Sequence, residues 1–459
     1  MKNRYIIILS VLLLSVSSCQ FKDDSWVDFN DLLSADGSKF KVLSTRETDL
    51  SQSFPADCYL PDGSAVQELS SAEGSQRRMP ALTVGEVADP LSDAGEAMAR
   101  VSSVSIAGVM QELLRYGNQD HAIEVAGTYL SSDVEYEPIE LSGKVILPKG
   151  RRPKRLILVS HYTIGSNAEA PSNCFSIEGV LVKMGYGLII PDYIGYGVTA
   201  DKVHPYLMMY TTAFNVIDMY LAVRDWLKAA DWEPEQDDIY LMGYSQGGAT
   251  TMAVEYVVEM AYSDPKDDDY IKIHRVFAGG GPYDVKATYE RFVNTDTASY
   301  PVAVPLVIQG MIHGNDLNIK MTDLMQGWLY ENLDSWINSK RYTTGQLNKL
   351  IGTNVTHNML TKEAMDQTSS NVSELYKAMT SNSIISYNWT PQASVYIMHS
   401  MDDETVPYTN ATNAKAKWHD ANITYNFGHY GSHVQTFLRF VYSVQTLLEQ
   451  EEKEMEIYK

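Results

Sequence analysis

Residues 239–248 read IYLMGYSQGG, an apolar strand-like run that leads into the pattern G-x-S-x-G around Ser245. A serine hydroxyl is a weak nucleophile unless it is held exposed beside a base, which a tight strand-to-helix turn achieves. The flanking glycines let strand and helix pass close together. An ordinary glycine-rich turn is the alternative, but the Ala- and Thr-rich helical pattern after the motif argues against it. Ser245 is therefore the predicted nucleophile, and the backbone N–H of Gln246 a predicted oxyanion donor.

Strand-like and helix-like segments alternate on both sides of this motif. Alternation of this kind requires crossover connections, so it predicts an α/β protein with a mostly parallel sheet and helices on both faces. The strand-like segments are 121–130, 139–147, 155–165, 186–197, 239–248, 274–284, 393–400 and 423–427. The helical patterns between and after them are 175–184, 208–230 and the stretch from 433 to about 450.

Two stretches depart from the alternation. Residues 286–390 carry helical patterns, such as 302–313 and 316–338, without a clear strand, and they predict a helical cap inserted into the sheet. Residues 20–105 are rich in Ser, Asp, Ala and Glu, and predict a loosely structured extension packed on the main domain. The predicted parts are a signal peptide at 1–18, an N-terminal extension at 19–110, a core in two parts at 111–285 and 391–459, and the cap at 286–390.

A serine nucleophile needs an acid that holds the tautomer of its histidine base and stabilises the imidazolium. Where such a serine stands on a strand-to-helix turn, the acid and then the base are expected to follow it along the chain. Asp403 and Asp402 both lie in the loop after the strand-like segment 393–400. Asp284 is a further candidate, because it follows the strand-like segment one earlier in the chain.

The candidate base is His433, which stands between a Gly-Ser turn and the final helical pattern. His429, four residues earlier, is the alternative, and we expect it to be a packed or solvated loop histidine. Two histidines four apart suggest a metal pair on a helix, but Gly431 between them argues against a helix. No H-E-x-x-H pattern is present either, so no metal site is predicted.

The second oxyanion donor is expected from the loop HYTIG at 161–165, which follows the strand RLILVS. The usual form of this loop is H-G-x-x-G, and Tyr162 stands here where a glycine is usual. That difference leaves open whether Tyr162 or Thr163 presents its N–H. We expect Thr163.

These motifs together resemble the α/β-hydrolase superfamily, and more narrowly its secretory lipase and esterase branch with a helical cap. The matching stretches are HYTIGS at 161–166, APS at 170–172, PDYIGYGVT at 191–199, HPYL at 204–207, AFNVIDM at 213–219, GYSQGG at 243–248 and DETVPY at 403–408. The resemblance implies ester hydrolysis through an acyl-enzyme on a Ser-His-Asp triad, without metal or organic cofactor. It also favours Asp403 as the acid, because D-x-x-V-P is similar to the acid loop of many α/β-hydrolases.

Other functions remain open on the sequence. A serine peptidase uses the same triad, and a non-catalytic surface lipoprotein could bind glycan or lipid on the same scaffold. The expected substrate is a small-molecule or polysaccharide-linked ester, and the cap aromatics Trp328, Tyr330 and Trp336 are expected either to line its pocket or to form the cap core. Nucleic acid is excluded as a partner, because 58 acidic against 36 basic residues give a net charge of −22.

The first 18 residues, MKNRYIIILSVLLLSVSS, have a basic start and an apolar run too short to span a bilayer. They predict a signal peptide, and the junction V-S-S-C resembles a lipobox in which Cys19 is acylated and anchors the protein to a membrane. A plain signal peptide is the alternative. The following residues, KDD at 22–24, either resemble an export signal of surface lipoproteins or form a short tether. We therefore expect the protein to be anchored by lipid in the outer membrane of the cell envelope. Whether Cys58 and Cys174 pair is left open.

Overall fold

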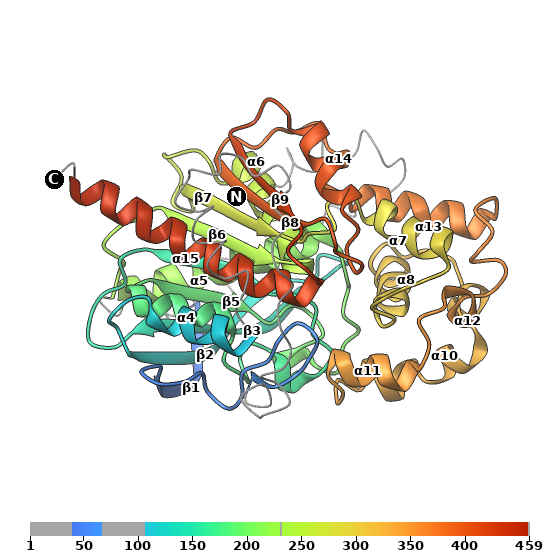
Figure 1. Cartoon of the computed structure of the whole chain (residues 1–459), viewed down its shortest axis with the longest axis horizontal. Helices are drawn as coiled ribbons and strands as arrows, with labels where there is room; N and C mark the ends of the chain where they lie inside the picture. The colour runs from blue at the N-terminus through green and yellow to red at the C-terminus, as the bar shows by residue number, and fades with distance from the viewer. Residues whose placement is uncertain (1–38, 67–105, 230–231, 458–459) are drawn as a thin grey trace.

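The computed structural model describes residues 39–66, 106–229 and 232–457, which build one large sheet flanked by helices (Figure 1). The expected signal peptide and Cys19 lie outside these residues. The sheet has nine strands. They are β1 (Phe40–Asp49), β2 (His121–Ser132), β3 (Pro138–Pro148), β4 (Leu156–Ser160), β5 (Gly187–Pro191), β6 (Ile239–Tyr244), β7 (Ile273–Gly279), β8 (Ser394–Ser400) and β9 (Ile423–Gly428).

The strand order is β1-β2-β3-β5-β4-β6-β7-β8-β9, and every neighbouring pair from β5 to β9 is parallel. The prediction of a mostly parallel sheet is therefore confirmed. The first three strands are antiparallel to their neighbours. Of these pairs, β2 and β3 are joined by a short turn, which antiparallel strands allow and parallel ones do not. The carboxyl ends of the parallel strands thus meet at one edge, where loops can bring side chains together.

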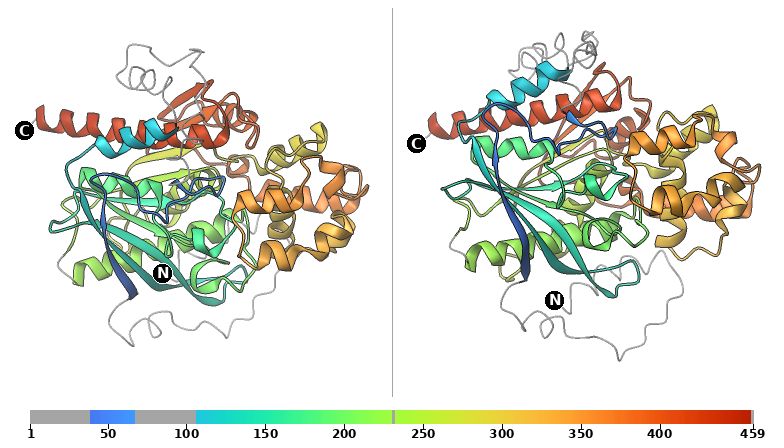
Figure 2. Two further views of the ribbon diagram at one scale, coloured as in Figure 1. Left: turned by 60° about the horizontal axis from the view of Figure 1, so that its bottom comes forward. Right: turned by 90° about the horizontal axis from the view of Figure 1, so that it is seen from below.

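Helices cover both faces of the sheet, and the alternation of side chains along each strand serves both layers. In β4, Leu156 and Leu158 face the core that includes α5 (Met209–Ala229) and α6 (Gln246–Ala261). Ile157 and Val159 face the opposite core with α4 (Ile106–Arg115) and α15 (His433–Ile457). Figure 2 shows α4 and α15 together on one side of the sheet.

Strand β1 lies inside the stretch that we expected to be loosely structured. It pairs antiparallel with β2 along its whole length and forms one edge of the sheet. Of its ten residues only Phe40 and Thr48 are buried, so it carries no apolar alternation that would predict a strand. Residues after it are buried as well, including Phe54, Cys58 and Leu60. The expectation of a loose extension is wrong for residues 40–66, and its other parts at 19–38 and 67–105 lie outside the described residues.

A group of helices connects β7 to β8 and projects from the carboxyl edge of the sheet (Figure 1). The described residues between these strands form two isolated bridges, Thr297–Val355 and Met325–Leu360, but no strand. The helices are α7 (Val285–Thr295), α8 (Ala303–Gly314), α9 (Met321–Leu324), α10 (Gly327–Glu331), a π-helix (Leu333–Asn338), α11 (Thr344–Ile351), α12 (Thr356–Met359) and α13 (Ser370–Ser381). Within the described ranges, no helix has the length and apolar character needed to cross a bilayer.

Candidate active site

Ser245 sits in the turn between β6 and α6 with φ 59° and ψ −125°, a backbone conformation that residues with a side chain rarely adopt. The glycines of the motif make this turn possible. A Cβ on Gly247 would lie 1.9 Å from the carbonyl oxygen of Ser160 in β4, and one on Gly243 would lie 2.3 Å from the Gly247 oxygen. The close approach of β4, β6 and α6 therefore raises Ser245 at the edge of the sheet.

His433 and Asp403 line up behind this serine. His433 Nε2 lies 2.8 Å from Ser245 Oγ, and His433 Nδ1 lies 2.5 Å from Asp403 Oδ2. All three side chains are buried, so these contacts are largely shielded from water. The structure thus brings together the three residues that the sequence proposed as nucleophile, base and acid.

The carboxylate of Asp403 has a partner on each oxygen. Its Oδ1 accepts the backbone N–H groups of Thr405 and Val406, both at 2.9 Å, while Oδ2 accepts from His433. Burial by itself raises the pKa of Asp403. The charge and hydrogen bond of His433, with smaller effects of His399 and the Val406 N–H, more than offset burial and hold that pKa below its ordinary value. Asp403 is therefore a carboxylate at neutral pH and can support an imidazolium.

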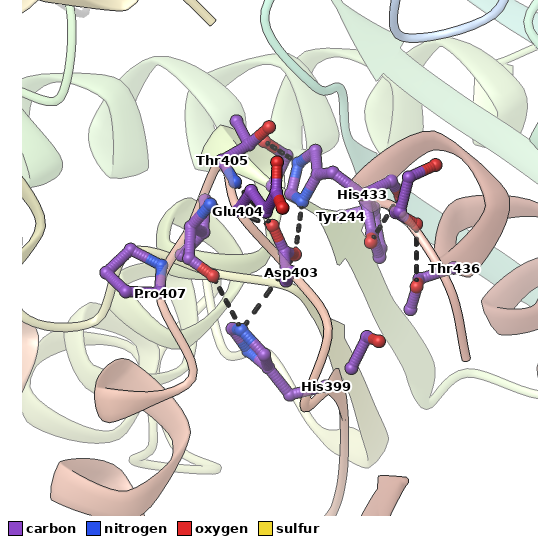
Figure 3. A network of polar contacts seen from close by, with 12 residues as sticks. Tyr244, His399, Asp403, Glu404, Thr405, Pro407, His433 and Thr436 are labelled. Atoms are coloured by element: carbon purple, nitrogen blue, oxygen red, sulfur yellow. Dashed lines mark hydrogen bonds and ion pairs between the residues drawn. The ribbon is translucent and has the colours of Figure 1, made fainter. Parts of the chain in front are cut away.

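His433 is held by its neighbours as well as by Asp403 (Figure 3). The hydroxyl of Tyr244 donates to the backbone oxygen of His433 at 2.7 Å, and the two rings lie 4.9 Å apart. Ser400 Oγ donates to the backbone oxygen of Gly431 at 2.8 Å, which ties the loop before His433 to the end of β8. Tyr244, the residue before the candidate nucleophile, therefore also positions the candidate base.

The alternative acids and base lie elsewhere. Asp402 and His429 pair with each other at 2.7 Å, and both side chains are 43 % exposed. Asp284 caps the start of α7 by accepting the Ala287 N–H at 3.0 Å, and it accepts a second bond from Asn413. Each of these groups has a local structural partner away from Ser245.

Thr163 lines the same pocket as Ser245, and its Oγ1 lies 2.8 Å from the hydroxyl of Tyr206. The ring Nδ1 of His161 lies 2.6 Å from the Tyr162 carbonyl oxygen. In a trans peptide the C=O and the following N–H lie in one plane and point in opposite directions, so the Thr163 N–H points away from the His161 ring. This geometry explains how a loop with Tyr162 in place of glycine keeps a defined path.

Gln246 is the first residue of α6, where the backbone N–H has no partner within the helix. Its side chain contacts His204: the two Nε2 atoms are 2.9 Å apart, and His204 Nδ1 lies 2.7 Å from the Ile194 carbonyl oxygen. Because a carbonyl only accepts, His204 carries its proton on Nδ1 and accepts from Gln246. Burial, with the charge of Lys340, lowers the pKa of His204 to about 3, so the ring stays neutral. We did not expect this support from the sequence.

A pocket of about 270 Å³ opens at Ser245 between the sheet edge and the helical group. Of the three cap aromatics that we considered for its wall, none is among the described residues that line it. Trp328 and Tyr330 are 37 % and 44 % exposed on the surface instead. The lining residues are Pro61, Asp62, Tyr162, Thr163, Tyr206, Leu207, Ser245, Pro282, Thr288, Phe292, Ser299, Tyr300, Ala303, Val307, Asn348, Thr405, Val406, Ser432, His433 and Val434.

The described part of the chain offers no cluster of three or more His, Cys, Asp or Glu side chains able to hold a metal ion. Cys58 and Cys174 are both buried free thiols. Burial raises the pKa of each thiol, so neither has the character of a reactive thiolate.

Comparison with known proteins identifies the family and the fold. The model of the secretory lipase family matches residues 168–439, more than half of the chain. No curated protein matches the sequence. Among solved structures, the chain is similar to the rice cell wall degrading esterase LipA from Xanthomonas oryzae, with a TM-score of 0.61 and 19 % identity over 75 % of this chain and 94 % of that one. It is also similar to a putative hydrolase from Legionella pneumophila, with a TM-score of 0.63 and 18 % identity over 78 % and 94 %.

A third similar structure is Candida antarctica lipase A, with a TM-score of 0.53 and 16 % identity over 68 % of this chain and 73 % of that one. At identities this low, the structural similarity shows the fold alone. It confirms the α/β-hydrolase fold that the motifs predicted, with a parallel sheet and helices on both faces.

Replacement of the acid tests the geometry directly. Asp403→Asn removes the negative charge and allows His433 to turn, so kcat should fall by at least about 10³-fold. Asp402→Asn and Asp284→Asn should stay within about threefold of wild type, since neither contacts His433. Steady-state hydrolysis of a soluble p-nitrophenyl ester by the three variants provides the measurement. A larger loss in Asp402→Asn or Asp284→Asn than in Asp403→Asn would contradict the assignment.

Proposed function

Because this chain belongs to the secretory lipase family, and is thus a serine hydrolase of the carboxylesterase and lipase type, we propose that Ser245, His433 and Asp403 form its catalytic triad. The observation that carries the proposal is the unbroken contact chain of 2.8 Å and 2.5 Å from Ser245 Oγ through the imidazole to Asp403. A peptidase would use the same residues, but the family membership favours esters.

In the proposed reaction, Ser245 Oγ attacks the ester carbonyl carbon while His433 Nε2 takes its proton. The carbonyl oxygen becomes an oxyanion, which accepts hydrogen bonds from the Gln246 and Thr163 N–H groups. His433 returns the proton to the leaving alcohol, and the acyl group stays on Ser245. Water then attacks the acyl-enzyme by the same route and releases the carboxylic acid.

The pocket supports a short or medium acyl group. Its volume of about 270 Å³ lies just below the range of ordinary ligand pockets. Apolar side chains such as Leu207, Phe292 and Val307 form part of the wall, which suits an acyl chain. The alcohol can be small or part of a polysaccharide, and the likeness to a rice cell wall degrading esterase supports including the latter.

The helical group acts as a fixed wall of this pocket rather than a moving lid. Tyr300 Oη and Thr344 Oγ1 both donate to the backbone oxygen of Pro61, at 3.0 and 3.2 Å. Ser299 Oγ donates to the backbone oxygen of Glu404 at 2.8 Å. The helical group is thus bonded both to the N-terminal segment and to the loop that carries Asp403, and an opening motion would break both connections.

Membership of a family of secretory lipases indicates a secreted or extracellular protein. Within that setting, the apolar run of residues 1–18 and the V-S-S-C junction support acylation of Cys19 and anchoring in the outer membrane. The lipid chain would hold the enzyme at the cell envelope, and the acidic residues after Cys19 would favour its display on the cell surface.

Ser245→Ala should lower kcat by at least about 10³-fold, because the members of a triad act as a unit. Ser263→Ala, two residues after the end of α6, is the matched control and should be unchanged. Circular dichroism and thermal melting would verify the fold of both variants. Activity of a folded Ser245→Ala variant within tenfold of wild type would overturn the proposed triad.

A fixed wall predicts ordinary saturation kinetics on tributyrin as its concentration passes the solubility limit. A lid would instead be stabilised open at the lipid surface, and the rate would jump at the onset of an emulsion. Rates measured on both sides of that limit decide the point. A sharp rise at emulsion onset would contradict the fixed wall.

Cys19→Ala should move the protein from the membrane fraction to the soluble fraction, because the variant has no thiol to acylate. Ser18→Ala keeps a small residue before the cysteine and should remain in the membrane fraction. Fractionation of cells that express each variant, followed by immunoblotting, gives the result. Unchanged membrane association of Cys19→Ala would refute the lipid anchor.

A further inference from the structure

A second histidine lies on the far side of Asp403 from His433 (Figure 3). His399 is in β8, one residue before its end, and its side chain is fully buried. Its Nε2 lies 2.9 Å from the backbone oxygen of Val406. Because a carbonyl oxygen only accepts, Nε2 carries the proton and the neutral ring has an unprotonated Nδ1. Within the described residues, that Nδ1 has no hydrogen-bond partner.

The same Nε2 faces the catalytic carboxylate. It lies 3.9 Å from Asp403 Oδ2, the oxygen that His433 Nδ1 contacts at 2.5 Å. The longer distance is outside hydrogen-bonding range, so His399 does not compete with His433 while its ring is neutral. Asp403 Oδ2 therefore lies between two imidazoles, of which only one is bonded to it.

Val406 links His399 to the position of the carboxylate. Its carbonyl accepts from His399, and its N–H donates to Asp403 Oδ1 at 2.9 Å. The Thr405 N–H donates to the same oxygen. Fixing the Val406 carbonyl thus fixes the turn whose N–H groups occupy Oδ1 and leave Oδ2 for His433.

We propose that His399 is a positioning residue for ester hydrolysis: its neutral Nε2–H holds the Val406 carbonyl and thereby keeps Asp403 Oδ2 directed at His433. This inference rests on the proposed triad of Ser245, His433 and Asp403. His399 does not touch the substrate or the reacting atoms, and it acts through the turn and the carboxylate. No motif of the sequence pointed to it.

The position of His399 beside Asp403 also makes the proposed triad sensitive to the protonation state of His399. Burial lowers the pKa of His399 below its ordinary value, and the charge of His433 lowers it further, against the opposing effects of Asp403 and the Val406 bond. The phenol of Tyr408 is a further titratable group near the ring, with ring centroids 6.1 Å apart. A protonated His399 would place a second cation beside Asp403 Oδ2 and oppose the imidazolium that His433 forms during catalysis.

Two substitutions separate the effect of losing the His399 hydrogen bond from the effect of losing the imidazole ring. His399→Gln keeps an N–H donor at a similar reach and cannot be protonated, so kcat near pH 8 should stay within about threefold of wild type. His399→Leu removes the donor, so kcat should fall about tenfold to hundredfold while KM changes less than about twofold. His429→Gln, an exposed histidine that pairs with Asp402, is the matched control and should be unchanged.

The pH profile provides a readout that a purely structural role would not change. At acid pH, log(kcat/KM) of the wild type should fall more steeply than that of His399→Gln, because the glutamine cannot take up the proton that His399 takes up. Circular dichroism across the same pH range shows whether the proteins remain folded, and the His399→Gln profile decides the matter even if His399→Leu does not fold.

Three results would overturn the inference: an unchanged kcat in His399→Leu, a folded His399→Gln as slow as His399→Leu, or equal acid slopes in wild type and His399→Gln. The underlying triad is tested separately. An active Ser245→Ala variant would overturn the proposed function itself. An inactive Ser245→Ala beside unaffected His399 variants would overturn only the role of His399.

Discussion

The backbone of Ser245 holds a conformation with φ 59° that costs about 1–3 kcal/mol, and the site depends on its being maintained. The turn survives because Gly247 packs directly on the Ser160 carbonyl, where any Cβ would collide at 1.9 Å. The surrounding strands β4 and β6 are buried along their whole length, and β7 is buried over its last four residues, 276–279. The other side chains of the site meet at this turn, because Asp403 reaches it from the loop after β8 and His433 from the start of α15.

The sequence predicted the fold class and the three candidate triad residues because these depend on local patterns. Apolar runs indicate buried strands, and G-x-S-x-G indicates a tight turn that needs its glycines. The choice of Asp403 over Asp402 needed the D-x-x-V-P resemblance, since both follow β8 in the chain. The structure shows the physical difference between them: the side chain of Asp403 turns inward to His433, and that of Asp402 turns outward to His429.

Other features depend on contacts between distant residues, which no local pattern reports. Strand β1 is stabilised by pairing with β2 rather than by an apolar face, so its mostly polar sequence did not predict a strand. His204 holds Gln246, and His399 holds Val406, only because the fold brings them together. A histidine four residues before the candidate acid was the one available signal for His399. Its significance depends on the path of the turn after it.

The contacts of Pro61 have a consequence for how the enzyme matures. Its carbonyl bonds Tyr300 and Thr344, which lie 239 and 283 positions further along the chain. Contacts so far apart in sequence close late, because a long loop must be ordered before they form. The substrate pocket, which Pro61 and Tyr300 line together, is therefore complete only after nearly the whole chain has been synthesised and folded. A chain that is still unfolded has no finished pocket, so hydrolytic activity begins only once these distant segments have come together.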